Sequence, residues 1–200
     1  MKDLKRSIGE IDIYLIDQIL KERYAKTDKI LDVGCGSGRN IKWFYQHDYR
    51  VWGCDKNEEI ILSVKNLYPN LARNFEVVEM SKLPYGDKSF DHIICSAVLH
   101  FAESTLHFKA MFSELIRVLK PCGSIFIRMA SNIGIESCIT HLEDGIFSLG
   151  DGTNRFLLTR ELLQEIMSVH SLEFIEPLKT TNVNDLRCMS TLVLQNRKET

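Results

Sequence analysis

The residues best suited to chemistry in this chain form a glycine-rich turn. Gly34, Gly36 and Gly38 alternate with other residue types directly after the apolar stretch 29–33, which contains Asp32. Glycine adopts positive φ angles easily and lets a ligand approach the main chain closely. A helix that starts just beyond the turn would offer unpaired N–H groups to the same ligand. This stretch therefore predicts a cleft in which a ligand lies against the main chain.

A second acidic residue, Asp55, follows the next apolar stretch, 50–54. A carboxylate at the end of a second strand can accept hydrogen bonds from both hydroxyls of a ribose. Asp55 therefore predicts an adenosine-type ligand, and the same geometry serves dinucleotides. The simpler interpretations are a helix N-cap for Asp32 and a turn residue for Asp55.

The spacing of the glycines separates two classes of cofactor. The nicotinamide dinucleotide fingerprint is G-x-G-x-x-G, with the pyrophosphate at a helix N-terminus. Here the third glycine comes one residue early, and Arg39 follows it. A carboxylate at Asp32 is poorly placed beside a pyrophosphate, but it suits the cationic amino-acid portion of S-adenosylmethionine, which has no phosphate. The spacing therefore favours S-adenosylmethionine, and a nicotinamide-dependent oxidoreductase is the alternative.

The elements that would position these residues alternate between strand and helix. Thr159 is expected to N-cap a helix that reaches 169, and strands at 172–175 and 189–194 are expected to pair antiparallel. The pattern predicts an α/β, doubly wound, Rossmann-like sheet of seven mostly parallel strands, with an antiparallel C-terminal strand and helices on both faces. The other predicted strands are 29–33, 50–54, 75–78, 91–96 and 124–129, and the other helices are 11–24, 39–47, 58–67 and 105–119.

Length and composition predict one soluble globular domain. The chain has 200 residues, 44% of them hydrophobic and 26% charged, which is ordinary for such a domain. Four parts are expected within 1–200: an N-terminal helical cap (1–27), a cofactor-binding core (28–130), an inserted loop or cap (131–158), and a C-terminal helix and strand pair (159–197).

Charge and hydropathy argue against several partners. The net charge of −2 gives no long-range attraction to nucleic acid or anionic membranes. No apolar run reaches the roughly 20 residues that cross a bilayer, and the N-terminus lacks the apolar core of a signal peptide. The cysteines form no Cys-x-x-Cys pair, so no metal site is expected. These features predict a cytoplasmic monomer or homodimer.

The run Leu31-Asp-Val-Gly-Cys-Gly-Ser-Gly-Arg-Asn40 resembles motif I of the class I S-adenosylmethionine-dependent methyltransferases. Arg117-Val-Leu-Lys-Pro-Cys-Gly123 resembles that family's R-x-L-K-P-G-G turn, with Cys122 in place of the first glycine. The combination of Gly38-Arg-Asn40 with Asp55-Lys-Asn57 is similar to tellurite-resistance-type members. The resemblance covers roughly residues 28–130. It implies S-adenosylmethionine as cofactor and methyl transfer by in-line displacement.

The resemblance also implies which residues bind the cofactor. Glu79 stands where the family has an aspartate that contacts the adenine amino group, and a solvated strand end is the alternative. Ser96 and Ala97 are small enough to let the ligand approach. The expected cofactor-binding residues are Asp32, Gly34, Cys35, Gly36, Gly38, Asn40, Asp55, Lys56, Glu79, Met80, Ser81, Ser96 and Ala97.

The acceptor side carries weaker signals. His100 is the candidate catalytic residue, because imidazole can exchange a proton near neutral pH; packing or hydrogen bonding is the alternative. Tyr14, Arg128 and Arg155 are expected to line the acceptor pocket, with Arg187 as a further candidate, since arginine binds carboxylate and phosphate groups. Motifs of base-modifying methyltransferases are absent, so a small-molecule acceptor is expected. A non-catalytic module that binds S-adenosylmethionine remains an alternative.

Overall fold

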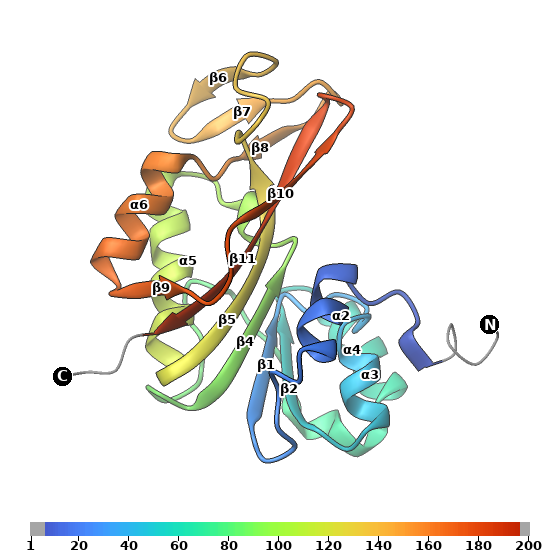
Figure 1. Ribbon diagram of the computed structural model, residues 1–200. Coiled ribbons are helices and arrows are strands. Elements are labelled where there is room, and N and C mark those ends of the chain that lie inside the picture. The colour runs from blue at the N-terminus through green and yellow to red at the C-terminus, as the bar shows by residue number, and fades with distance from the viewer. Residues whose placement is uncertain (1–6, 197–200) are drawn as a thin grey trace.

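The computed structural model describes residues 7–196, and its main feature is an eight-stranded sheet (Figure 1). Residues 1–6 of the predicted cap and residues 197–200 lie outside the described part. The parallel strands stand in the order β3-β2-β1-β4-β5. They are β1 (Lys29–Val33), β2 (Arg50–Asp55), β3 (Phe75–Val77), β4 (Phe90–Ser96) and β5 (Leu119–Ser131). Because β1 lies between β2 and β4, the strand order reverses there, and ligands bind at such a switch point.

Antiparallel strands complete the sheet. β11 (Arg187–Asn196) pairs with β5, and both β9 (Leu172–Phe174) and β10 (Lys179–Val183) pair with β11. The predicted α/β fold with antiparallel C-terminal strands is confirmed. β10 is an addition to the strands that the sequence predicts. Its residues are exposed or half-buried and mostly polar, so it carries no hydrophobic alternation.

The segment 131–158 contains a second sheet of three antiparallel strands. They are β6 (Thr140–Glu143), β7 (Ile146–Ser148) and β8 (Asn154–Phe156). Figure 1 shows this small sheet beside the turn between β10 and β11. Leu149, Leu157 and Cys188 share a buried apolar cluster there, so the insertion is packed onto the main sheet.

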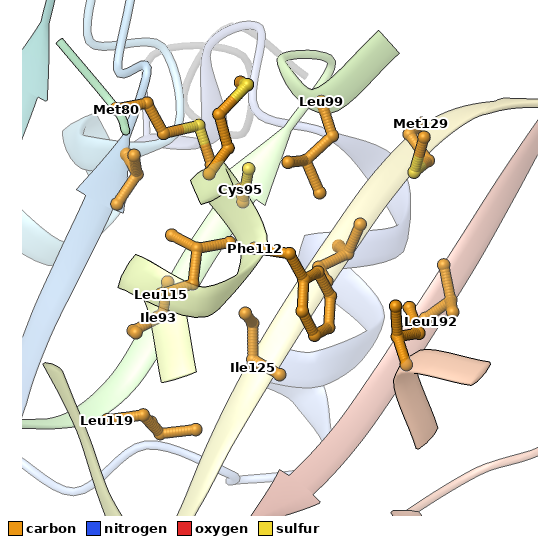
Figure 2. Close-up of a cluster of buried hydrophobic side chains, with 14 of the residues drawn as sticks. Met80, Ile93, Cys95, Leu99, Phe112, Leu115, Leu119, Ile125, Met129 and Leu192 are labelled. Carbon is orange, nitrogen blue, oxygen red and sulfur yellow. The ribbon is translucent and has the colours of Figure 1, made fainter. Parts of the chain in front are cut away.

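Helices cover both faces of the main sheet (Figure 1). On one face lie α2 (Ile13–Leu20), α3 (Ile41–Gln46) and α4 (Glu58–Leu67); on the other lie α5 (Thr105–Val118) and α6 (Arg160–Val169). Figure 2 shows Phe112 and Leu115 of α5 against Ile93 and Ile125 of the sheet. Two short 3-10 helices, η1 (Pro69–Asn74) and η2 (Leu99–Phe101), complete the elements. Among residues 7–196, no helix is long and apolar enough to cross a membrane.

Side-chain oxygens fix where the helices start. Thr159 Oγ1 accepts a hydrogen bond from Leu162 N at 3.2 Å, which confirms the predicted cap. Asp12 Oδ1 accepts from Tyr14 N at 2.9 Å, so α2 begins at Ile13. The predicted helix 11–24 was too long, because Asp12 caps the helix at its start and Lys21 ends it.

Candidate active site

The turn after β1 is shaped by its three glycines. Gly34, Gly36 and Gly38 have φ angles of +67°, +51° and +74°, which glycine adopts without steric cost. A Cβ at Gly34 would lie 2.3 Å from Val98 Cγ2, so the segment after β4 leaves no room for a side chain at this position. A Cβ at Gly36 would meet no atom within 4 Å. Gly36 therefore leaves open space where a ligand can lie against the main chain.

A cavity of about 730 Å³ lies at the carboxyl ends of β1, β2 and β4. Most of the predicted cofactor-binding residues line it. These are Gly34, Cys35, Gly36, Asn40, Asp55, Lys56, Glu79, Met80, Ser96 and Ala97. Asp32, Gly38 and Ser81 are not part of its lining. Gly38 instead packs against Tyr68, whose hydroxyl donates a hydrogen bond to Gly38 O at 2.9 Å.

Asp55 ties the glycine turn to the end of β2. Its Oδ2 accepts a hydrogen bond from Gly36 N at 3.0 Å, and its Oδ1 accepts one from Asn57 N at 3.0 Å. A carboxylate oxygen can accept more than one hydrogen bond. Both oxygens of Asp55 can therefore still accept from ligand hydroxyls in the cavity that this residue lines.

Asp32 lies in β1, directly before the glycine turn. It is 1% exposed, and its Oδ2 has no hydrogen-bond partner. Burial raises the pKa of Asp32 to about 7; the nearby Arg39 opposes this rise and Asp55 adds to it. A buried carboxylate without a partner favours binding of a positive charge nearby.

Asp12 joins several parts of the site, and sequence reasoning missed it. Its backbone N donates to Asn40 Oδ1 at 3.0 Å, and Ser96 Oγ donates to its Oδ2 at 3.1 Å. The same oxygen lies 3.8 Å from Arg39 Nη2 and 3.4 Å from Arg128 Nη1. Asp12 is 3% exposed. It therefore docks the start of α2 onto two cavity-lining residues and two arginines.

Sequence reasoning also missed part of the cavity wall. Val98 and Phe101 belong to the segment 96–101, which the sequence predicts beside the acceptor, whereas His107 and Met111, one helical turn apart on α5, were not predicted. The spacing of the latter two was a signal that one face of this helix meets the site, but it is also the spacing of an ordinary core helix. The other unpredicted wall residues are Val33, Ser37, Arg39, Cys54 and Val78.

Three of the predicted acceptor residues, Arg128, Arg155 and Arg187, line a second cavity of about 310 Å³ together with His100. Tyr14 lines neither this cavity nor the larger one. Its ring lies 5.3 Å from the Arg128 guanidinium carbon, and its hydroxyl is 2.5 Å from Thr181 Oγ1. Tyr14 thus packs against Arg128 without lining the cavity itself.

His100 is buried, and its Nδ1 accepts a hydrogen bond from Ala130 N at 3.3 Å. Burial, together with the positive charges of Arg155 and Arg128, lowers the pKa of His100 to about 4. The imidazole is therefore neutral at pH 7, with its proton on Nε2. This tautomer argues against the predicted proton transfer and favours the alternative, a hydrogen-bonding role.

Residues 31–127 match a family model described as a methyltransferase domain. This stretch, just under half of the chain, is similar to methyltransferase domains. A solved structure described as a SAM-dependent methyltransferase from Methanosarcina mazei has the same fold, with a TM-score of 0.72 and 22% identity. The alignment covers 90% of this chain and 98% of that one. S-adenosylmethionine is the cofactor that the sequence predicts for this domain.

Curated relatives match about half of the chain. The chain is 31% identical over 112 residues to the uncharacterized methyltransferase YodH of Bacillus subtilis (strain 168), covering 55% of this chain and 43% of the relative. It is 31% identical over 102 residues to the tRNA (carboxymethyluridine(34)-5-O)-methyltransferase of Arabidopsis thaliana, covering 49% of this chain and 23% of the relative. The match thus spans less than half of either relative. Neither relative marks the tellurite-resistance subgroup, which stays a prediction.

The cavity of the methyltransferase domain fits this cofactor. The unpaired buried oxygen of Asp32 complements a ligand that carries positive charge. The open space at Gly36 admits a ligand against the main chain, and Asp55 retains acceptor capacity for ribose hydroxyls. Val78 and Met80 add apolar wall, which suits a purine ring.

Proposed function

We propose that this chain transfers a methyl group from S-adenosylmethionine to a small-molecule acceptor. The observation that carries the proposal is the pairing of two cavities: the cofactor cavity and the second, smaller cavity share Ala97 and Phe101 as walls. An acceptor held in the second cavity would thus reach the cofactor cavity across this shared wall.

Each side of the cofactor cavity has a distinct proposed role. Asp55 accepts the ribose hydroxyls, Glu79 and Met80 contact the adenine, and Asp32 favours the cationic end. Bound there, S-adenosylmethionine supplies an electrophilic methyl group on a positively charged sulfur. Ala97 and Phe101 restrict the direction from which an acceptor approaches.

The proposed chemistry asks for positioning rather than for an acid–base pair. A reaction of two bound partners gains most from holding the reacting atoms about 3–3.5 Å apart and aligned. A base is needed only where the acceptor must lose a proton. His100 is therefore proposed as a hydrogen-bond donor to the acceptor through Nε2.

The proposed acting unit is one domain over residues 1–200, functioning as a cytoplasmic monomer or homodimer. Asp12 of the cap contacts Ser96 of the core, and Arg155 of the insertion lines the second cavity. The cap and the insertion are thus proposed as parts of the acceptor site.

Calorimetry with S-adenosylhomocysteine and NAD tests the cofactor part of the proposal. S-adenosylhomocysteine should bind, and Asp55→Ala should weaken it by about 1–3 kcal/mol, since a charged hydrogen-bond acceptor is lost. Asp87→Ala, in the exposed turn before β4, is the matched control. Binding of NAD alone, or unchanged affinity in Asp55→Ala, would contradict the proposal.

Transfer of a labelled methyl group tests the acceptor part. A panel of small acids, phenols, amines and thiols should contain a substrate, and bulk tRNA should not be labelled. Labelling of tRNA alone would place this chain with its Arabidopsis relative instead. Binding of S-adenosylhomocysteine with no labelling of either class would favour the non-catalytic alternative.

A further inference from the structure

The second cavity gathers three arginines from three different strands. Arg128 comes from β5, Arg155 from β8 and Arg187 from the start of β11. These strands belong to both sheets, and Figure 1 shows the sheets meeting at this end of the molecule. The rest of the wall is largely apolar and includes Leu149, Val183 and Met189. The cavity thus joins a cationic set of side chains to an apolar surface.

Two carboxylates lie beside these three arginines. Arg128 Nη1 lies 3.4 Å from Asp12 Oδ2, and Arg187 Nη1 lies 3.6 Å from Asp151 Oδ2. Asp12 already accepts hydrogen bonds from Tyr14 N and Ser96 Oγ. Arg155 donates to Asn154 O, a neutral carbonyl, at 2.7 Å. The cavity therefore has more positive than negative charge.

Donor groups in the cavity wall also lack partners. Arg128 Nε is buried and makes no hydrogen bond. The Arg155 guanidinium carbon lies 5.2 Å from the centre of the Phe101 ring, so the shared wall holds this arginine from one side. His100 uses Nδ1 as an acceptor, which leaves Nε2–H as a donor. A buried donor without a partner is costly, so hydrogen-bond acceptors are in short supply around Arg128.

We infer that the second cavity binds an anionic group, a carboxylate or phosphate, of the methyl acceptor, whose apolar body lies along Leu149, Val183 and Met189. The inference rests on the proposed function, because it takes the ligand to be the acceptor. The planar guanidinium forks of Arg128 and Arg155 suit oxyanions, which they can bind through paired hydrogen bonds. Phe101, which lines both cavities, then determines the orientation of the acceptor between the anion site and the cofactor cavity.

Binding of three six-carbon probes tests this inference. Hexanoate, hexyl phosphate and the neutral hexanamide share an apolar chain and differ in the head group. Their dissociation constants are measured by ligand-observed NMR with and without saturating S-adenosylhomocysteine. At least one anion should bind about tenfold or more tightly than hexanamide. The better anion identifies the head group as carboxylate or phosphate.

Arg155→Gln and Arg187→Gln remove the charge, keep a polar side chain and shorten it. Arg187 is 54% exposed at its side chain, so its replacement leaves the core intact. Each variant should weaken the anion about tenfold while the dissociation constant of S-adenosylhomocysteine stays unchanged. Arg73→Gln, exposed in η1, is the matched control and should change neither.

Two outcomes separate the hypotheses. Equal binding of hexanamide and the anions, or anion binding that both arginine substitutions leave unchanged, overturns the anion site. Failure of S-adenosylhomocysteine to bind the parent protein overturns the proposed function instead, and the probe titrations without it still report on the anion site.

Discussion

Asp12 and Ser96 are 84 residues apart in the chain, and Ser96 Oγ donates a hydrogen bond to Asp12 Oδ2 at 3.1 Å. Asp12 stands before the first residue of α2, and Ser96 is the last residue of β4. The N-terminal cap is thus attached at the ligand edge of the sheet. Arg128, which lines the second cavity, reaches the same carboxylate oxygen. One buried aspartate therefore connects the cap to both cavities.

Asp12→Asn should lower the free energy of unfolding by about 1.5–3 kcal/mol, because the partly exposed Arg39 and Arg128 lose their charged partner. Asparagine still caps a helix, so the substitution isolates the loss of charge. Urea unfolding measures the effect. Asp17→Asn on the same helix is the control; its side chain is 38% exposed, and its surface ion pairs should contribute no more than about 1 kcal/mol. Equal effects of both substitutions would contradict the role of Asp12.

Gly36→Ala should separate binding from stability. The φ of +51° at Gly36 makes alanine about 1–2 kcal/mol less favourable there. The added methyl meets no protein atom within 4 Å, so it occupies ligand space. Affinity for S-adenosylhomocysteine should fall at least about tenfold, or ~1.4 kcal/mol. Gly86→Ala, outside the cavity and with only Ser89 Oγ near its Cβ at 3.6 Å, should leave affinity unchanged.

Cys122→Gly should stabilise the chain without affecting the cofactor. Cys122 has a φ of +62° within β5, at a position where the resembling family has glycine. Glycine removes a strain of about 1 kcal/mol. Cys122 is not part of either cavity lining. Thermal unfolding should show the gain, and calorimetry should show an unchanged affinity; a lower melting temperature would contradict the strain.

The sequence was informative where function depends on local chain geometry. Gly34, Gly36 and Asp55 stand at strand ends, and strand ends follow from apolar runs and turn residues. These positions are therefore visible without the fold. The core helices and parallel strands were visible for the same reason.

The sequence was uninformative where a residue's role depends on a distant partner. Tyr14 was expected in the acceptor pocket, but its hydroxyl pairs with Thr181, 167 residues away. Asp12 is part of no motif, since its distant partners come from three separate segments of the chain. β6 was missed because all of its residues are exposed, and exposure on both faces leaves no alternation to detect.

His100 should remain neutral throughout the range in which an ordinary histidine titrates. Its folded pKa of about 4 lies below the reference value of 6.5, so the unfolded chain binds the proton more readily. The stability linked to His100 is present above pH 6.5 and is lost as the pH falls toward 4. NMR of the imidazole should show Nδ1 unprotonated at pH 5.5. In His100→Gln, the loss of stability between pH 6.5 and 4 should shrink by about 1–3 kcal/mol.

His141→Gln, on the exposed strand β6, is the control for removal of an imidazole. A step in the rate–pH profile near pH 6.5 that His100→Gln abolishes would restore the proton-transfer role.

Asp32→Asn should stabilise the free protein most at high pH. The folded pKa of Asp32, about 7, lies above its reference value of 3.8. The native state therefore keeps a proton that the unfolded chain has lost, and stability falls as the pH rises from about 4 through 7. Asparagine removes this penalty, which is on the order of a few kcal/mol at pH 8. Urea unfolding at pH 5 and pH 8 should show a gain that is larger at pH 8.

The same substitution should weaken the binding of the cofactor. A positively charged ammonium group of the ligand near Asp32 favours the ionised carboxylate, so the affinity of the parent protein for S-adenosylhomocysteine should rise between pH 6 and 8. Asp32→Asn should remove most of that rise, and the exposed Asp87→Asn should keep it. A stability gain that does not depend on pH, together with an unchanged dependence of affinity on pH, would mean that Asp32 does not ionise in this range and does not interact with the ligand.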